Sequence, residues 1–228
     1  MHCIFKLVFF CLLLLLSACT MPKEISNALY DREVDELLQN TAAEYIVHAG
    51  LENKDATLLN KRTAAVVKEQ AQLIEIKLES MLSEDEVATI RQPDEGVLIV
   101  IPSDFMFKSG RSELTEGGIR YMEGFAFILS QFPDFRTYIL VHTDNNASEY
   151  MSLALSEERA KTLKKILKKE GLGAVHTEGK GALVPIITNE SEEGRKLNRR
   201  VEIAVVASPN LIKQSRKAIK RDIRKSNN

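Results

Sequence analysis

Residues 137–171 read TYILVHTDNNASEYMSLALSEERAKTLKKILKKEG, and this stretch has the clearest secondary-structure pattern in the chain. Its first part, Thr137–His142, is a short apolar run with the composition of a buried strand. Its last part, Glu157–Glu170, has the pattern of a helix, and Gly171 stands where such a helix ends. The stretch therefore predicts a strand and a helix that are joined by a polar segment.

The chain on either side continues this alternation. Val97–Ile101 predicts a buried strand, Thr115–Gln131 predicts a helix, and Arg200–Val206 predicts an alternating strand. Strands separated by helices are typical of an α/β or α+β sandwich. The sequence therefore predicts one such domain over residues 97–207, which is long enough for one hydrophobic core.

Several motifs occur in series within this domain. They are Phe107-Lys108-Ser109-Gly110, Glu113-Leu114-Thr115, His142-Thr143-Asp144-Asn145, Leu155-Ser156-Glu157-Glu158-Arg159-Ala160, and Glu193-Gly194-Arg195-Lys196-Leu197-Asn198-Arg199-Arg200-Val201-Glu202. Their order and spacing resemble the OmpA-like peptidoglycan-binding domain. The resemblance implies an α+β fold, an α/β sandwich whose mixed sheet has helices on one face. An α-helical segment is expected before it.

Asp144 and Arg159 are the binding pair that the resemblance implies. In that family an aspartate and an arginine at this spacing bind the diaminopimelate of the peptidoglycan stem peptide. Its free end is a zwitterion, so its ammonium needs a carboxylate and its carboxylate needs the paired planar donors of a guanidinium. We expect Ser156 to be the N-cap of the helix, which would place Arg159 in the first turn and the ligand at the helix N-terminus. The alternative is an isolated surface ion pair of little energetic value.

The resemblance also implies further peptidoglycan-binding residues at the same site. Thr143 belongs to the aspartate motif, Arg199 would be a further donor, and Asn198 would fix a loop. For Asn198 and Arg199 the alternative is a cap at the end of a strand. Two positions differ from many family members, because Lys108 replaces an aspartate and Ser152 replaces an asparagine. Ser152 is retained as a candidate site residue, and the affinity or the preferred stem peptide is expected to change.

Residues 1–18 have the pattern of a lipoprotein signal peptide. Lys6 lies before the apolar run Leu7–Leu16, which is too short to span a membrane. Leu16-Ser17-Ala18-Cys19 looks like a bacterial lipobox, in which the cysteine is acylated and becomes the N-terminus. The alternative is an ordinary signal peptide that is cleaved near Ala18. Thr20 is not the aspartate that retains many lipoproteins at the inner membrane, which favours the periplasmic face of the outer membrane.

Residues 19–96 form an acidic segment with helical spacing; residues 20–96 carry 16 acidic and 8 basic side chains. Within the predicted helix Asp55–Leu82, the apolar residues share one predicted stripe: Leu58, Leu59, Ala65, Val66, Leu73 and Ile76. A short third helix is predicted from Ser83 to just before Pro93. The segment could be a spacer or a hairpin that binds envelope proteins through residues 23–92. Plain helical packing with a solvated acidic face is the alternative, which we favour.

Residues 208–228 form a basic tail with 7 basic and 1 acidic side chains. Leu211, Ser215, Ile219 and Ile223 recur every four residues, which predicts an amphipathic helix that packs on its own chain. An anionic membrane face, wall polymers or the acidic helices of this chain are other surfaces on which it could dock. We expect no nucleic-acid partner, because the protein is predicted to lie outside the cytoplasm.

The sequence contains no motif for catalysis, a metal or a cofactor. The 3 cysteines lie within the first twenty residues, so the body of the protein can form no internal disulfide and no thiolate metal cluster. Lys108-Ser109-Gly110 is superficially similar to a motif of penicillin-binding enzymes, but no Ser-x-x-Lys occurs in the chain. His142 and Asp144 could share a strand face without a third metal ligand, so we expect a histidine with satisfied hydrogen bonds. The protein is therefore predicted not to be an enzyme.

Together these features predict a lipid-anchored protein that binds peptidoglycan non-covalently and tethers the outer membrane to the cell wall. The alternative is an assembly or scaffold lipoprotein of an envelope or secretion machine. In that case the OmpA-like domain would serve mainly for positioning.

Overall fold

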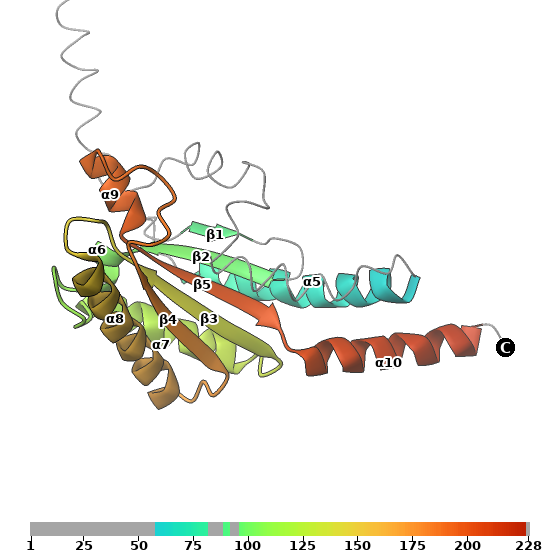
Figure 1. Cartoon of the computed structure of the whole chain (residues 1–228). Helices are drawn as coiled ribbons and strands as arrows, with labels where there is room; N and C mark the ends of the chain where they lie inside the picture. The colour runs from blue at the N-terminus through green and yellow to red at the C-terminus, as the bar shows by residue number, and fades with distance from the viewer. Residues whose placement is uncertain (1–57, 82–88, 92–95, 227–228) are drawn as a thin grey trace, which may run out of the picture.

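The computed structural model describes residues 58–81, 89–91 and 96–226, which form a five-stranded sheet with helices packed on it (Figure 1). In spatial order the strands are β1 (Thr89–Arg91), β2 (Gly96–Pro102), β5 (Arg200–Ala207), β3 (Phe135–His142) and β4 (Val175–Gly181). β3 and β4 are parallel, whereas the other neighbouring strands are antiparallel. The expected mixed sheet is confirmed.

Of the described helices, the three long helices α5, α7 and α8 cover one face of this sheet. The described helices are α5 (Leu58–Glu79), α6 (Ser103–Met106), α7 (Glu116–Ser130), α8 (Glu149–Lys169), α9 (Glu192–Asn198) and α10 (Pro209–Ser226). α5, α7 and α8 contribute buried side chains to a single core together with the sheet. The expected arrangement, with helices on one face, is therefore confirmed.

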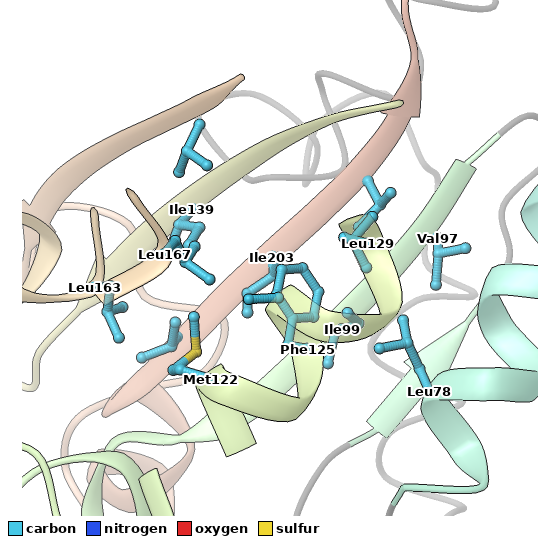
Figure 2. Close-up of a cluster of buried hydrophobic side chains, with 14 of the residues drawn as sticks. Leu78, Val97, Ile99, Met122, Phe125, Leu129, Ile139, Leu163, Leu167 and Ile203 are labelled. Atoms are coloured by element: carbon cyan, nitrogen blue, oxygen red, sulfur yellow. The ribbon is translucent and has the colours of Figure 1, made fainter. Parts of the chain in front are cut away.

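The hydrophobic core lies between the sheet and these three helices (Figure 2). Ile203 of β5 shares the core with Phe125 of α7, Leu163 of α8 and Leu78 of α5. Because side chains alternate along a strand, the residues of β5 on either side of Ile203, among them Glu202, point to the opposite face of the sheet. β5 is buried along its whole length, so both of its faces are covered.

The start of α8 differs from the prediction. α8 begins at Glu149 and not at Glu157, and its N-cap is Ser148, whose side chain accepts a hydrogen bond from the backbone of Met151. Arg159 therefore lies near the middle of α8 and not in its first turn. The predicted end is confirmed, because Gly171 follows the helix with a positive φ of 89°.

The face of α5 that packs on the sheet also differs from the prediction. Leu73 and Ile76 were expected on the buried stripe, but they are 50% and 60% exposed. Over residues 62–79 of α5, the buried residues are instead Thr63, Val67, Ala71, Ile74 and Leu78. They follow the i, i+4 and i+3 steps of one helix face, and this face meets β2 and α7.

The predicted third helix is wrong at its C-terminal end. Thr89–Arg91 is the edge strand β1, and its backbone pairs with β2, where Ile90 lies opposite Ile99. Backbone pairing with β2 therefore overrides the helical pattern of residues 89–91. The sequence also predicted a domain boundary at residue 96. Among the described residues, α5 and β1 lie before this boundary and both contact β2, which lies after it, so the elements on its two sides pack together.

The basic tail forms α10, which packs along α5 at the right of Figure 1. This confirms an amphipathic helix that packs on its own chain. Within the described residues, no helix is long and apolar enough to cross a membrane. The predicted signal peptide 1–18, the predicted lipobox with Cys19, and residues 23–57, 82–88 and 92–95 of the acidic segment lie outside the described residues.

Candidate functional site

Asp144 lies just beyond the end of β3, in the segment that leads into α8. One carboxylate oxygen accepts a hydrogen bond from the backbone N–H of Asn146 at 3.1 Å, and the other lies 2.7 Å from Nη1 of Arg199. The residue is 9% exposed. Because a carboxylate has about four acceptor positions, it retains capacity for a further donor.

Arg199 joins three carboxylates that come from separate parts of the chain. Its Nη1 donates to Asp144, whereas its Nη2 donates to Glu192 at 3.0 Å and to Asp104 at 3.3 Å. Burial alone would lower the pKa of Arg199, but the hydrogen bonds to Asp144 and Glu192 outweigh burial and raise it. The guanidinium is therefore a fixed positive charge that holds α6, α9 and the end of β3 together.

Arg159 is held in a different way. Its Nε donates to the carbonyl oxygen of Arg111 at 2.9 Å, and its guanidinium lies 4.8 Å from the centre of the Phe107 ring. The residue is only 5% exposed. Within the part of the chain that the structure describes, neither Nη1 nor Nη2 of Arg159 has a hydrogen-bond partner. The outer edge of a planar guanidinium is thus oriented and free to bind an anion.

Asp144 and Arg159 share one electrostatic environment without pairing. Burial lowers the pKa of Arg159, Asp104 and Asp144 raise it, and Arg199 lowers it. Among the described residues, the ion pair of Asp144 is with Arg199 and none joins it to Arg159. The alternative in which Asp144 and Arg159 form only a surface ion pair with each other is therefore wrong. A carboxylate and an unengaged guanidinium edge are the two groups that a ligand carrying both charges requires.

Asn198 has the contacts of a loop-fixing residue. It is fully buried, its side-chain oxygen accepts from the backbone N–H groups of Ile186 and Ile187, and its amide donates to the carbonyl of Ile187 and to Asn189. These bonds hold the segment before α9 against the start of β5. Asn198 therefore supports the position of its neighbour Arg199.

Thr143, which directly precedes Asp144, and Ser152 are both buried. Thr143 donates its backbone N–H to Gly181 and its hydroxyl to the carbonyl of Asp144. Ser152 lies in the first turn of α8, and no residue that the structure describes bonds its hydroxyl. Thr143 therefore belongs to the end of β3, and the Ser152 hydroxyl is buried without a hydrogen-bond partner among the described residues.

The Ser156 hydroxyl does not cap a helix. It donates to the carbonyl of Leu153 and accepts from the backbone N–H of Gly181 at 2.9 Å. The predicted N-cap at Ser156 is therefore wrong, because this hydroxyl joins the middle of α8 to β4. The N-terminus of α8 instead lies at Ser148, four residues after Asp144.

Three neighbours of the site were not assigned a role from the sequence. Asp104 and Glu192 contact Arg199, and the ring of Phe107 lies against Arg159. Of these three residues, only Phe107 belongs to a sequence motif, Phe107-Lys108-Ser109-Gly110. Lys108, which follows it, is exposed and forms an ion pair with Glu113 within the same loop.

Behind the site, His142 lies in a buried charged cluster on the sheet face that is opposite the helices. Glu202 and Arg200 form an ion pair there at 2.7 Å, and both are almost fully buried. Burial and Arg200 lower the pKa of His142 to about 3, against an opposing effect of Glu202, so its 3.6 Å contact with Glu202 is not an ion pair near neutral pH. The expectation of satisfied hydrogen bonds is wrong, since neither ring nitrogen has a partner among the described residues.

Comparison with known proteins identifies the family. The sequence profile of the OmpA family matches residues 106–199, which include Asp144, Arg159 and Arg199. Outer membrane protein A of Bordetella avium is 36% identical over 132 residues, which are 54% of this chain and 68% of that protein. The chain belongs to the OmpA family.

In two further relatives, the match to this chain covers a smaller share of the relative than it does in outer membrane protein A. The probable lipoprotein YiaD of Escherichia coli (strain K12) is 29% identical over 133 residues, 58% of this chain and 60% of that protein. The peptidoglycan-binding protein ArfA of Mycobacterium bovis is 43% identical over 79 residues, 34% of this chain and 24% of that protein. The match therefore spans less than two thirds of each of these two relatives.

A solved structure agrees with the OmpA-family fold. The cell wall anchor of the T6SS from Pseudomonas aeruginosa superposes with a TM-score of 0.51 at 26% identity, and the match covers 59% of this chain and 99% of that one. The shared region is therefore nearly the whole of a wall-anchoring domain.

Proposed function

We propose that this OmpA-family protein binds peptidoglycan non-covalently, through the diaminopimelate of a stem peptide, and tethers the outer membrane to the cell wall. Asp144 accepts the ligand ammonium, and the free Nη groups of Arg159 donate to the ligand carboxylate. Arg199 and Thr143 complete the binding site, Asn198 positions Arg199, and Ser152 in the first turn of α8 belongs to the same proposed site. The role is one of attachment and not of catalysis.

One observation carries this proposal, namely that Arg159 is buried and oriented while its Nη groups have no hydrogen-bond partner among the described residues. A buried guanidinium normally finds partners for its donors, because an unpaired buried charge is costly. Here Nε is bound and the ring of Phe107 lies against the guanidinium, yet both Nη groups are unengaged among the described residues. Such a guanidinium is preorganised for a two-pronged contact with a carboxylate. Asp144, which acts on the same guanidinium, supplies the opposite charge that a zwitterion needs.

The relatives support the same role. ArfA is named as a peptidoglycan-binding protein, and the T6SS protein is named as a cell wall anchor. Wall attachment is the property that these two names share. It requires a binding site of the kind formed by Asp144 and Arg159, without a nucleophile or a metal.

We further propose that Cys19 is acylated and anchors the chain in the outer membrane. The support is the sequence Leu16-Ser17-Ala18-Cys19 and the naming of the relative YiaD as a probable lipoprotein. Several acyl chains give stable anchoring, because each buried methylene contributes about 0.8 kcal/mol.

Sedimentation with purified peptidoglycan tests the binding site. We expect Asp144→Asn and Arg159→Lys to bind at least about tenfold more weakly than the unmodified protein, since each removes one charge-assisted contact or its planar geometry. Arg120→Ala is the matched control, because Arg120 is an exposed arginine on α7 whose ion pair, within the described part of the chain, is with Glu116. Equal sedimentation of all four folded proteins would refute the proposed site.

Fractionation of cells tests the lipid anchor. We expect the unmodified protein to remain with the membranes and to incorporate labelled palmitate, whereas Cys19→Ser should lose the label and be released with the soluble fraction, because it lacks the acceptor thiol. A labelled Cys19→Ser protein, or an unlabelled protein with Cys19 intact, would contradict acylation at this residue.

A further inference from the structure

We propose that the outer face of α10 is a docking surface for an anionic phospholipid bilayer. We call this surface the α10 basic face, and it consists of Lys213, Lys217, Lys220, Arg221 and Arg224. This inference goes beyond the binding of peptidoglycan, and it does not depend on the Asp144 site.

The charge of α10 is concentrated on one side of the helix. Residues 209–226 contain seven basic side chains, and Asp222 is the one acidic side chain among them. At about 100° per residue, the α10 basic face occupies an arc of roughly 100°. All five of its residues are exposed. The helix therefore presents a stripe of positive charge that runs about 17 Å along its axis, from Lys213 to Arg224.

The apolar side of α10 is already in use. Leu211 is buried in the core, and Ile212, Ala218, Ile219 and Ile223 are partly buried on the side of α10 away from the basic face. α10 packs along α5, as Figure 1 also shows. Docking therefore needs no insertion of the helix into the acyl region. It depends on attraction between charges, which salt weakens.

The position of α10 fits a protein that contacts two surfaces. β5 begins directly after Arg199 of the binding site and ends at Ala207, two residues before α10 starts. Eight residues of strand span roughly 26 Å, so the start of α10 and the binding site lie at opposite ends of β5. In Figure 1, α10 projects away from the side on which α6 and α9 lie. A bilayer that contacts α10 would leave the Asp144 site exposed to a second ligand.

The shape of the α10 basic face favours a bilayer over a compact anion. Its cations lie in a row and do not converge on one point, so they match many phosphates spread over a plane. Clusters of four to eight lysines and arginines on an amphipathic helix are typical of segments that bind anionic lipids. The long, flexible stems of lysine and arginine let each charge reach its own lipid headgroup.

Vesicle sedimentation of residues 20–228 tests the proposal. This polypeptide contains every described contact of the fold and lacks the acylated cysteine, so the lipid anchor cannot contribute. We expect it to bind vesicles of phosphatidylglycerol and phosphatidylcholine at low salt, to dissociate at high salt, and to ignore vesicles of phosphatidylcholine alone. The triple variant Lys217→Glu, Lys220→Glu, Arg224→Glu should bind at least about tenfold more weakly.

The matched control is the triple variant Lys161→Glu, Lys165→Glu, Lys168→Glu. It changes the net charge by the same amount through three exposed lysines on one side of α8, and it should bind within about twofold of the unmodified chain, as expected for surface charges away from the contact. Equal losses in the two triple variants would overturn the proposal, because net charge alone would then explain binding. So would equal binding to neutral vesicles, or retention by purified wall polymers with none by vesicles. Peptidoglycan sedimentation of the same variants separates this result from a failure of the Asp144 site.

Discussion

Glu202→Ala is expected to lower the free energy of unfolding by about 3 to 5 kcal/mol. Oε1 of Glu202 accepts from Nε of Arg200 at 2.7 Å, and Nη2 of Arg200 lies at the same distance. Arg200 is 1% exposed, so removing the carboxylate leaves a buried guanidinium without its counter-ion. Since domains are stable by about 5 to 15 kcal/mol, the loss is a large fraction of the total. Denaturant unfolding monitored by circular dichroism measures it.

The double variant Arg200→Met, Glu202→Leu is the control for this prediction. Replacing both members of a buried ion pair by apolar residues of similar volume is often nearly neutral. The double variant leaves the carbonyls of Val184 and Asn198 without their donor, so we expect it to recover most but not all of the loss. A single variant within about 1 kcal/mol of the unmodified protein, or a double variant as unstable as the single one, would contradict the argument.

Gly179→Ala is expected to destabilise the protein by about 3 kcal/mol, at the upper end of the range for overpacking. A Cβ at Gly179 would lie 2.3 Å from the backbone nitrogen of Glu157 and 2.5 Å from the carbonyl carbon of Ser156. Both atoms belong to the backbone of α8, so the whole helix must move away from β4. Arg159 is on the same helix, and the variant should therefore also weaken peptidoglycan binding.

Gly173→Ala is the matched control for this substitution. A Cβ at Gly173 meets no atom within 4 Å, and its φ is not positive. We therefore expect a change of less than about 0.5 kcal/mol in the free energy of unfolding, measured by the same denaturant titration. Equal stability of the two alanine variants would show that α8 can shift without cost.

Local patterns predicted most of the elements, because their signals lie within the elements themselves. The strand at Val97–Ile101 and the helix at Thr115–Gln131 occur almost as expected. The start of α8 could not be predicted in this way. Ser148 and Ser156 are both followed by a glutamate, so the local sequence does not show which of the two serines is the N-cap. What distinguishes them is the bond of Ser156 to Gly181, which is 25 residues away in the chain. No local pattern can contain such a contact.

The site was predicted in part for the same reason. Asp144, Arg159 and Arg199 came from motifs, and the structure brings them into one electrostatic environment. Asp104 was missed because it is 95 residues from Arg199, its partner. The buried face of α5 was missed because α5 has apolar residues on more than one side, such as the exposed Leu73 and the buried Ile74. Helical periodicity alone does not show which of these sides meets the sheet. The packing of α5 on β2, α7 and α10 decides that.

The central place of β5 has a mechanical consequence under the proposed attachment to a wall and a membrane. β5 pairs antiparallel with β2 on one side and with β3 on the other, over seven residue pairs each. The hydrogen bonds of such ladders lie perpendicular to the strands. A pull between Asp144, which follows β3, and α10, which follows β5, would load the ladder between these two strands in shear, so that its hydrogen bonds resist together instead of opening one at a time.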